Sequence, residues 1–213
     1  MKFCDDTIKK FIEDLESDMP APGGGSVAGL IAALSGALNS MVYSLTVGKK
    51  SYMSLNEKTQ NMIIDFQKKS IEFSKKSLEI MDEDRENFLK LMDCYKMPKD
   101  TDEEKENRKK AIRDNTIKSM EAPLALAREC IGFYDNLKIM AEYGNKMLLS
   151  DLGISAILLH SAVESSIVNV KVNLKALKNE EFFEDLDKEI KNILEISLIE
   201  RNKISEIVEK VIY

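Results

Sequence analysis

The chain has 213 residues, 44% of them hydrophobic and 32% charged, which predicts one globular domain over 1–213 with a sizeable buried core. Its net charge of −6 argues against a nucleic-acid partner, because phosphate backbones are bound by an excess of lysine and arginine. Three cysteines without a CxxC pair and a single histidine argue against a disulfide framework and a transition-metal site, and favour reduced thiols in a cytoplasmic protein.

Apolar residues recur at three- and four-residue steps along almost the whole chain, which is typical of α-helices. The first such stretch, from Phe3 to Leu15, ends before Pro20 and lacks the apolar core of a signal peptide. Further helices are predicted over about 26–47, 56–94, 101–132, 134–147, 150–177 and 180–213, with a bend or interruption near Pro123 and a break near Asp187. No stretch is expected to cross a bilayer, so no membrane partner is expected.

Strands are not expected, because β-branched alternation is rare in this sequence. The sequence therefore predicts an all-α fold, a single helical bundle domain with long antiparallel helices. The two apolar helices over 26–47 and 150–177 bring more apolar surface than one small bundle usually buries. That excess predicts a homo-oligomer that associates through helices.

The segment PAPGGGSVAGL places Gly23, Gly24 and Gly25 directly before Ser26, where a helix is predicted to start. Free N–H groups and the positive end of the dipole make a helix N-terminus a binding site for phosphates, carboxylates or oxyanions. The segment is not a Walker loop, because no Gly-Lys-Ser/Thr follows the glycines. The alternative is a tight turn that allows close helix packing, and spacing alone leaves both interpretations open.

Asp84 falls on the apolar stripe of the helix over 56–94, between Ile80 and Phe88, whereas Asp82 lies off the stripe and is expected to be solvated. A carboxylate among apolar groups has either a partner or a raised pKa, and both suit a general acid or base near neutral pH. The alternative is a buried ion pair or hydrogen bond to another helix. Spacing taken alone favours that alternative.

The remaining polar groups are candidates for ligand binding or for helix capping. They are Lys49, Lys50 and Tyr52 after the helix over 26–47, which is rich in small residues, Asn145, Ser150 and Asp151 in GNKMLLSDLG, and Asn169 and Asn173 in NVKVNL. Lysines at a helix C-terminus are favoured by the dipole without any ligand, and Ser150 or Asp151 would cap the following helix. Buried amides need partners, which a cap or a heterocycle supplies. His160 and Glu164 stand one turn apart, the spacing of an ion pair, but a lone histidine in an apolar helix is more often a satisfied core residue.

Taken in order, these segments resemble the C-terminal domain of the formiminotransferase-cyclodeaminase family. The segments are PAPGGGSVAGLIAALSGAL, LTVGKKSY, DEDRENF, MPKDTDEEKENR, GNKMLLSDLG and NVKVNL, and they span the chain from the first helix to about Leu177. The chain has no room for the N-terminal transferase domain of the bifunctional form, so it resembles a stand-alone version. The resemblance implies an all-helical homodimer that needs no metal and no cofactor.

The resemblance also implies a reaction at the carbon that bridges nitrogens 5 and 10 of tetrahydrofolate. Methenyltetrahydrofolate cyclohydrolase opens the 5,10-methenyl form to 10-formyltetrahydrofolate. This reaction is preferred, because a chain without a fused transferase domain has no domain of its own to supply the formimino substrate. The alternatives are formiminotetrahydrofolate cyclodeaminase, which closes the 5-formimino form and releases ammonia, and a folate-binding helical module without turnover.

By the same resemblance Asp84 and Asp151 are the candidate acid–base residues, with Asp84 the stronger. The candidate substrate-binding residues are Pro22, Gly23, Gly24, Gly25, Ser26, Lys49, Lys50, Tyr52, Asn145, Ser150, Asn169 and Asn173. The glycine N–H groups and the lysines are expected to hold the glutamate carboxylates of a folate, with or without a polyglutamate tail. The asparagines are expected to form hydrogen bonds with the polar edge of the pterin.

Overall fold

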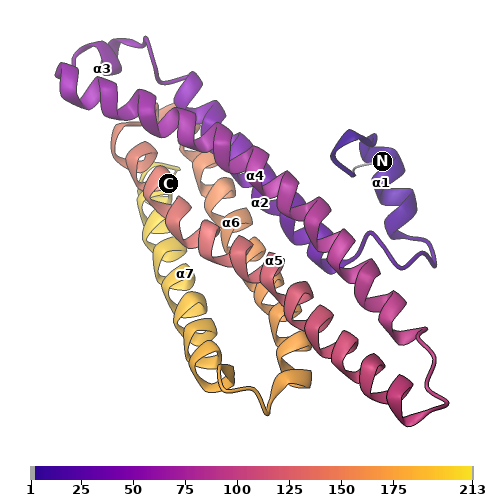
Figure 1. The fold of residues 1–213 in the computed structure, drawn as a ribbon. Helices are drawn as coiled ribbons and strands as arrows, with labels where there is room; N and C mark the ends of the chain where they lie inside the picture. Colours follow the sequence, from indigo (N-terminus) through magenta and orange to yellow (C-terminus); the bar gives the residue numbers. More distant parts are fainter. Residues whose placement is uncertain (1–2, 213) are drawn as a thin grey trace.

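The structure is a computed structural model that describes residues 3–212. Within these residues the chain forms helices and no strand, which confirms the all-α class (Figure 1). The α-helices are α1 (Ile8–Leu15), α2 (Gly24–Ser44), α3 (Lys50–Met53), α4 (Glu57–Tyr95), α5 (Asp102–Tyr143), α6 (Leu149–Leu174) and α7 (Phe183–Ile212). Short 3₁₀ turns are η1 (Phe3–Asp5), η2 (Lys146–Leu148) and η3 (Lys175–Leu177). The predicted domain limits include residues 1, 2 and 213, which lie outside the described part.

The predicted break between 101–132 and 134–147 is wrong, because α5 runs through Gly132 without interruption. A glycine inside a helix costs only about 1 kcal/mol, which the packing of α5 along α4 and α6 outweighs. The break expected near Asp187 is also absent, because α7 is continuous. The start of α5 is confirmed: the Thr101 hydroxyl accepts from the Glu104 N–H, and the Glu104 carboxylate accepts from the Thr101 N–H.

Pro123 lies inside α5 and does not interrupt it. A proline has no N–H, so it leaves the carbonyl of the residue four positions earlier, Ser119, without its helical donor. The Asn173 side chain of α6 donates to that carbonyl at 3.4 Å. The proline thus supplies a hydrogen-bond acceptor between two helices.

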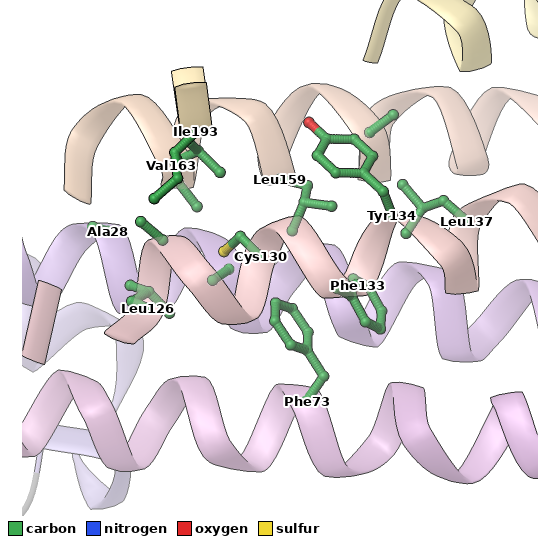
Figure 2. Packing of buried hydrophobic residues seen from close by; sticks show 14 of the residues in the cluster. Ala28, Phe73, Leu126, Cys130, Phe133, Tyr134, Leu137, Leu159, Val163 and Ile193 are labelled. Atoms are coloured by element: carbon green, nitrogen blue, oxygen red, sulfur yellow. The ribbon is translucent and has the colours of Figure 1, made fainter. Parts of the chain in front are cut away.

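The five long helices pack side by side as a bundle. α2 lies against α4 and α6, α5 lies against α4 and α6, and α7 covers one side of α5 and α6 (Figure 1). Figure 2 shows the interior, where the rings of Phe73 on α4 and Phe133 on α5 stack with their centroids 3.9 Å apart. α2 approaches α4 closely at Gly29, which has no side chain: a Cβ there would stand only 2.7 Å from the Met81 Cβ. For Gly29, the packing interpretation of the small-residue helix is therefore confirmed.

Two helices are long and apolar enough to cross a membrane by length and composition, contrary to the expectation above. They are Gly24–Ser44 and the stretch Lys146–Leu177, with mean hydropathy of 1.5 and 1.4. Their most apolar windows are 56% and 50% buried inside the bundle. A core helix passes the same test, so length and composition assign no membrane role to either helix.

Candidate active site

A cavity of about 180 Å³ lies where α2 begins. It is lined by Pro20, Ala21, Gly23, Gly24, Gly25, Ser26, Asp84, Arg85, Phe88, Ser119, Asn169, Val172 and Asn173. The turn before α2 and the helices α2, α4, α5 and α6 therefore all contribute to it. Larger hollows of about 590 and 520 Å³ lie along α4 beside Phe66 and Phe73, but none of the predicted site residues lines them.

The glycine block meets the carboxylate of Asp84 at the start of α2. Gly23 is the N-cap in an extended conformation, so the N–H groups of the next three residues have no carbonyl partner within the helix. A Cβ at Gly25 would overlap the Asp84 carboxylate, whereas one at Gly24 would lie 3.6 Å from Asn169 Oδ1 and one at Gly23 would meet nothing within 4 Å. Gly25 is thus the glycine that makes room for the carboxylate.

Asp84 is half-buried, and among residues 3–212 no hydrogen bond or ion pair reaches its carboxylate. Its loss of hydration raises the pKa from 3.8 to about 6, since burial disfavours the charged form. The buried ion pair that spacing favoured is therefore not found in this part of the chain. A carboxyl group that titrates near pH 6 can both accept and return a proton at neutral pH.

The two asparagines of α6 present acceptors to the cavity. Asn169 Nδ2 donates to the Ser165 carbonyl at 2.9 Å, and Asn173 Nδ2 donates to the carbonyls of Asn169 and Ser119. These bonds fix both amides through their nitrogen atoms. No described residue donates to either Oδ1, so these oxygens are available to N–H groups of a ligand.

Six lining residues were not predicted as site residues, and two of them, Pro20 and Ala21, directly precede the predicted Pro22. Arg85 and Phe88 belong to DEDRENF, and Phe88 stands one turn after Asp84 on the same stripe, so the pattern contained a signal for them. Val172 lies between the two asparagines. Ser119 had no local signal, because it reaches the cavity only through the packing of α5. The predicted Pro22 is buried directly before Gly23 but does not line the cavity.

Six predicted site residues lie at the other end of the bundle. They are Lys49, Lys50 and Tyr52 after α2, and Asn145, Ser150 and Asp151 at the start of α6. Gly24 and Ser44 bound 21 residues of helix, so roughly 30 Å separates the two ends. The N–H of Asn145 donates to Thr46 Oγ1 at 2.9 Å, which joins the two segments at that end. Within one chain these six residues do not reach the cavity.

The capping role expected of Ser150 or Asp151 is wrong, because α6 begins after Leu148 without a side-chain cap. Asp151 lies in the first turn of α6, where the helix dipole favours an acidic side chain.

Asp82 is buried, contrary to expectation, because it anchors the N-terminal segment. Its Oδ1 accepts from the Phe3 N–H at 2.7 Å, and its Oδ2 accepts from the Cys4 thiol at 3.4 Å. The core interpretation of His160 agrees with its contacts: Nδ1 lies 2.8 Å from the Ser197 hydroxyl, and Nε2 lies 3.8 Å from Glu164. Neither residue belongs to the cavity.

Replacing Asp84 by Asn is expected to stabilise the protein above about pH 6. The folded state binds the Asp84 proton more tightly than the unfolded state, so the unfolding free energy falls as pH rises from about 4 to about 6. The substitution should therefore raise it by roughly 1–3 kcal/mol at about pH 8 and by nothing at about pH 4. Urea unfolding at both pH values measures this difference, and an equal effect at both would contradict it.

Comparison with known proteins shows the family. Residues 7–192 match the model of the family described as formiminotransferase-cyclodeaminase. Methenyltetrahydrofolate cyclohydrolase of Methylorubrum extorquens is 34% identical over 189 residues, which cover 89% of each chain. Formimidoyltransferase-cyclodeaminase of Mus musculus is 31% identical over 90% of this chain but only 35% of its own length. This chain therefore spans about a third of that relative.

The fold is also that of a solved relative. The crystal structure of formiminotetrahydrofolate cyclodeaminase from Thermotoga maritima matches with a TM-score of 0.85 and 25% identity, and the match covers 98% of both chains. The sequence match and the structural match both extend over the helices that line the cavity. The chain therefore belongs to the formiminotransferase-cyclodeaminase family.

Proposed function

We propose that the chain is a folate enzyme that hydrolyses 5,10-methenyltetrahydrofolate to 10-formyltetrahydrofolate. The observation that carries this proposal is Asp84, a carboxylate with a pKa of about 6 that Gly25 admits into the cavity. The name of the Methylorubrum extorquens relative, which has nearly the same length, supports the choice of reaction.

In the proposed reaction Asp84 moves one proton. Its carboxylate takes a proton from water as the water oxygen attacks the methenyl carbon, which gives a tetrahedral carbinolamine. The protonated Asp84 then donates to nitrogen 5 as the bond from carbon to nitrogen 5 breaks, and the hydroxyl proton leaves to solvent as the formyl carbonyl forms. The negative carboxylate also stabilises the cationic amidinium of the substrate before attack.

The other lining residues position the substrate. The Oδ1 atoms of Asn169 and Asn173 accept hydrogen bonds from the N–H groups of the pterin, and Phe88 offers a ring for the pterin to stack on. The free N–H groups of Gly24 and Gly25 bind an electronegative edge of the substrate. A polyglutamylated folate is part of the proposal, because its tail carries the carboxylates that cations outside the cavity would hold.

The reaction is proposed to proceed without a cofactor or a metal ion. The bridging carbon stays at the oxidation level of formate from the methenyl form to the formyl form, so no electron acceptor is required. We place the reaction in the cytoplasm, because the buried thiols of Cys94 and Cys130 suit a reducing compartment.

The second candidate is the cyclodeaminase reaction, which the similarity to the Thermotoga maritima structure favours. There nitrogen 10 attacks the formimino carbon and gives up its proton to the imine nitrogen, and protonated Asp84 donates a second proton to that nitrogen as its bond to carbon breaks, so that it leaves as ammonia. The same cavity and the same residue would serve both reactions.

A spectrophotometric assay tests the proposal. Methenyltetrahydrofolate absorbs in the near ultraviolet, so loss of that absorbance on adding the protein reports hydrolysis. Its appearance from the 5-formimino compound, together with ammonia, reports deamination instead. If neither signal changes while the folate still binds, the chain is a binding module and the proposed activity is wrong.

The pH dependence of kcat/KM reports the role of Asp84. If its carboxylate is the base for water attack, kcat/KM should rise about tenfold per pH unit below about pH 6 and level off above it. The sign follows because the active form is the deprotonated one. Steady-state rates from about pH 4.5 to about pH 8 measure the profile, and a rate that falls through this range would assign Asp84 the acid role of the second candidate.

A further inference from the structure

Among residues 3–212, Pro123 is the only proline inside a helix. A helix interior tolerates proline least of all residues, because its nitrogen carries no hydrogen and its ring crowds the carbonyl four positions earlier. In α5 that carbonyl belongs to Ser119, which lines the cavity. The gap in the hydrogen bonding of α5 therefore falls at a wall of the cavity.

The Ser119 carbonyl has a donor from another helix instead. Ser119 is 5% exposed, and a buried backbone carbonyl without a donor is costly. Asn173 Nδ2 on α6 donates to this carbonyl at 3.4 Å, while the Ser119 hydroxyl is engaged separately, as the donor to the Asn87 carbonyl of α4 at 3.1 Å. The Asn173 side chain thus takes the place of the missing helical donor.

This contact distinguishes the two asparagines that line the cavity. Asn173 Nδ2 also donates to the Asn169 carbonyl of its own helix at 3.2 Å, so its two hydrogens reach acceptors on two helices. Two acceptors fix the plane of the amide and with it the direction of Oδ1. Asn169 Nδ2 donates within α6 alone, to the Ser165 carbonyl at 2.9 Å. Only the amide of Asn173 is therefore held by α5 as well.

We propose that Pro123 is a positioning residue of the site: by leaving the Ser119 carbonyl to Asn173, it fixes the Asn173 amide with Oδ1 available to the substrate. Pro123 does not itself line the cavity and acts through these two residues. That the substrate is a folate, whose N–H groups this oxygen accepts, rests on the function proposed above.

Pro123→Ala is expected to release the amide. The variant supplies an N–H at position 123, which bonds to the Ser119 carbonyl and turns it toward the helix axis. At 3.4 Å the bond from Asn173 is already longer than the usual 2.7–3.2 Å, so a small turn breaks it. KM should rise about two- to tenfold, the effect of one hydrogen bond. kcat should stay within about twofold, because the amide binds substrate and transition state alike.

Steady-state kinetics measure this division between KM and kcat, with Gly132→Ala as the matched control. Gly132 lies in the same helix, is exposed, and a Cβ there would meet nothing within 4 Å. Its replacement also favours the helix but leaves the cavity untouched, so KM should equal that of the wild type. An unchanged KM in Pro123→Ala, or an equal rise in both variants, would overturn the proposal.

A double-mutant cycle separates positioning from a general effect on α5. In an Asn173→Ala background, Pro123→Ala should raise KM no further, because the amide that it would release is already absent. In an Asn169→Ala background the whole rise should remain, since the Asn169 side chain bonds only within α6. A rise that persists without Asn173 would show that Pro123 acts by another route, against the proposal.

Nuclear magnetic resonance tests the positioning without any turnover. Pro123→Ala should shift the side-chain amide signal of Asn173 and speed its exchange with solvent, but leave that of Asn169 unchanged. The new N–H at position 123 should exchange slowly, as the donor to Ser119. An Asn173 signal that is the same in both proteins would overturn the positioning. A wild type that neither binds nor converts 5,10-methenyltetrahydrofolate would refute the proposed function, while the amide signals still decide the role of Pro123.

Discussion

Asp84→Asn is expected to lower kcat by roughly 10²–10⁴-fold, the contribution that a general acid or base usually makes. An amide fills the same space beside Gly25 but neither takes a proton from water nor returns one to a leaving nitrogen. KM should change little, because the substrate contacts from α2 and α6 remain. Steady-state kinetics at about pH 7.5, with the absorbance of the methenyl form as the signal, measure both constants.

The control is Glu83→Gln, which changes the neighbouring carboxylate of α4. Glu83 is exposed and does not line the cavity, so this variant should keep the wild-type rate. A near-normal kcat for Asp84→Asn would remove Asp84 from the chemistry. An equal loss in both variants would point to a general effect on α4.

Gly25→Ala is expected to cost about 10²-fold in kcat, because the new Cβ would overlap the Asp84 carboxylate and force one of the two to move. A displacement of ~1 Å at a reacting group is enough for a loss of this size. The variant should still fold, since alanine is a better helix residue than glycine by about 0.5–1 kcal/mol. Measurements of kcat and of the thermal midpoint separate the two effects.

Gly23→Ala is the matched substitution, two residues earlier in the same block. A Cβ at Gly23 would meet nothing within 4 Å, and its backbone is extended, so activity should stay near that of the wild type. If both variants lose the same activity, flexibility of the whole block matters rather than the room that Gly25 leaves for Asp84. If neither loses activity, the contact between Gly25 and Asp84 has no role in the reaction.

Local spacing was enough to predict most of the helices and the position of Asp84. Each depends on neighbours three and four residues away, which a sequence displays directly. The continuity of α5 through Gly132 was not predictable, because long-range packing along α4 and α6 overrides a local preference.

The site was predictable only in part for the same reason. The glycine block was evident in the sequence, but only the position of α4 distinguishes Gly25 from Gly23. Ser119 enters the cavity only through the packing of α5. Because Pro123 has no N–H, the Ser119 carbonyl accepts from Asn173 instead, a hydrogen bond between residues 54 positions apart. The predicted helix over 26–47 already stands between Gly24 and Lys49, but only the family resemblance placed both residues in one site, and the length of α2 separates them within one chain.

The segment before the glycine block is held to the bundle by few contacts of its own. α1 has eight residues, too few to be stable alone, and Phe3 and Phe11 pack with Met81 in a cluster separate from the main core. Such a segment unfolds locally at a lower free energy than the bundle, so its amide hydrogens exchange with solvent first. The turn that follows α1 is one wall of the cavity, whereas Asp84 belongs to the long helix α4, which packs along α2 and α5. The wall beside the glycine block is therefore expected to open at a lower free energy than the wall that carries the reacting carboxylate.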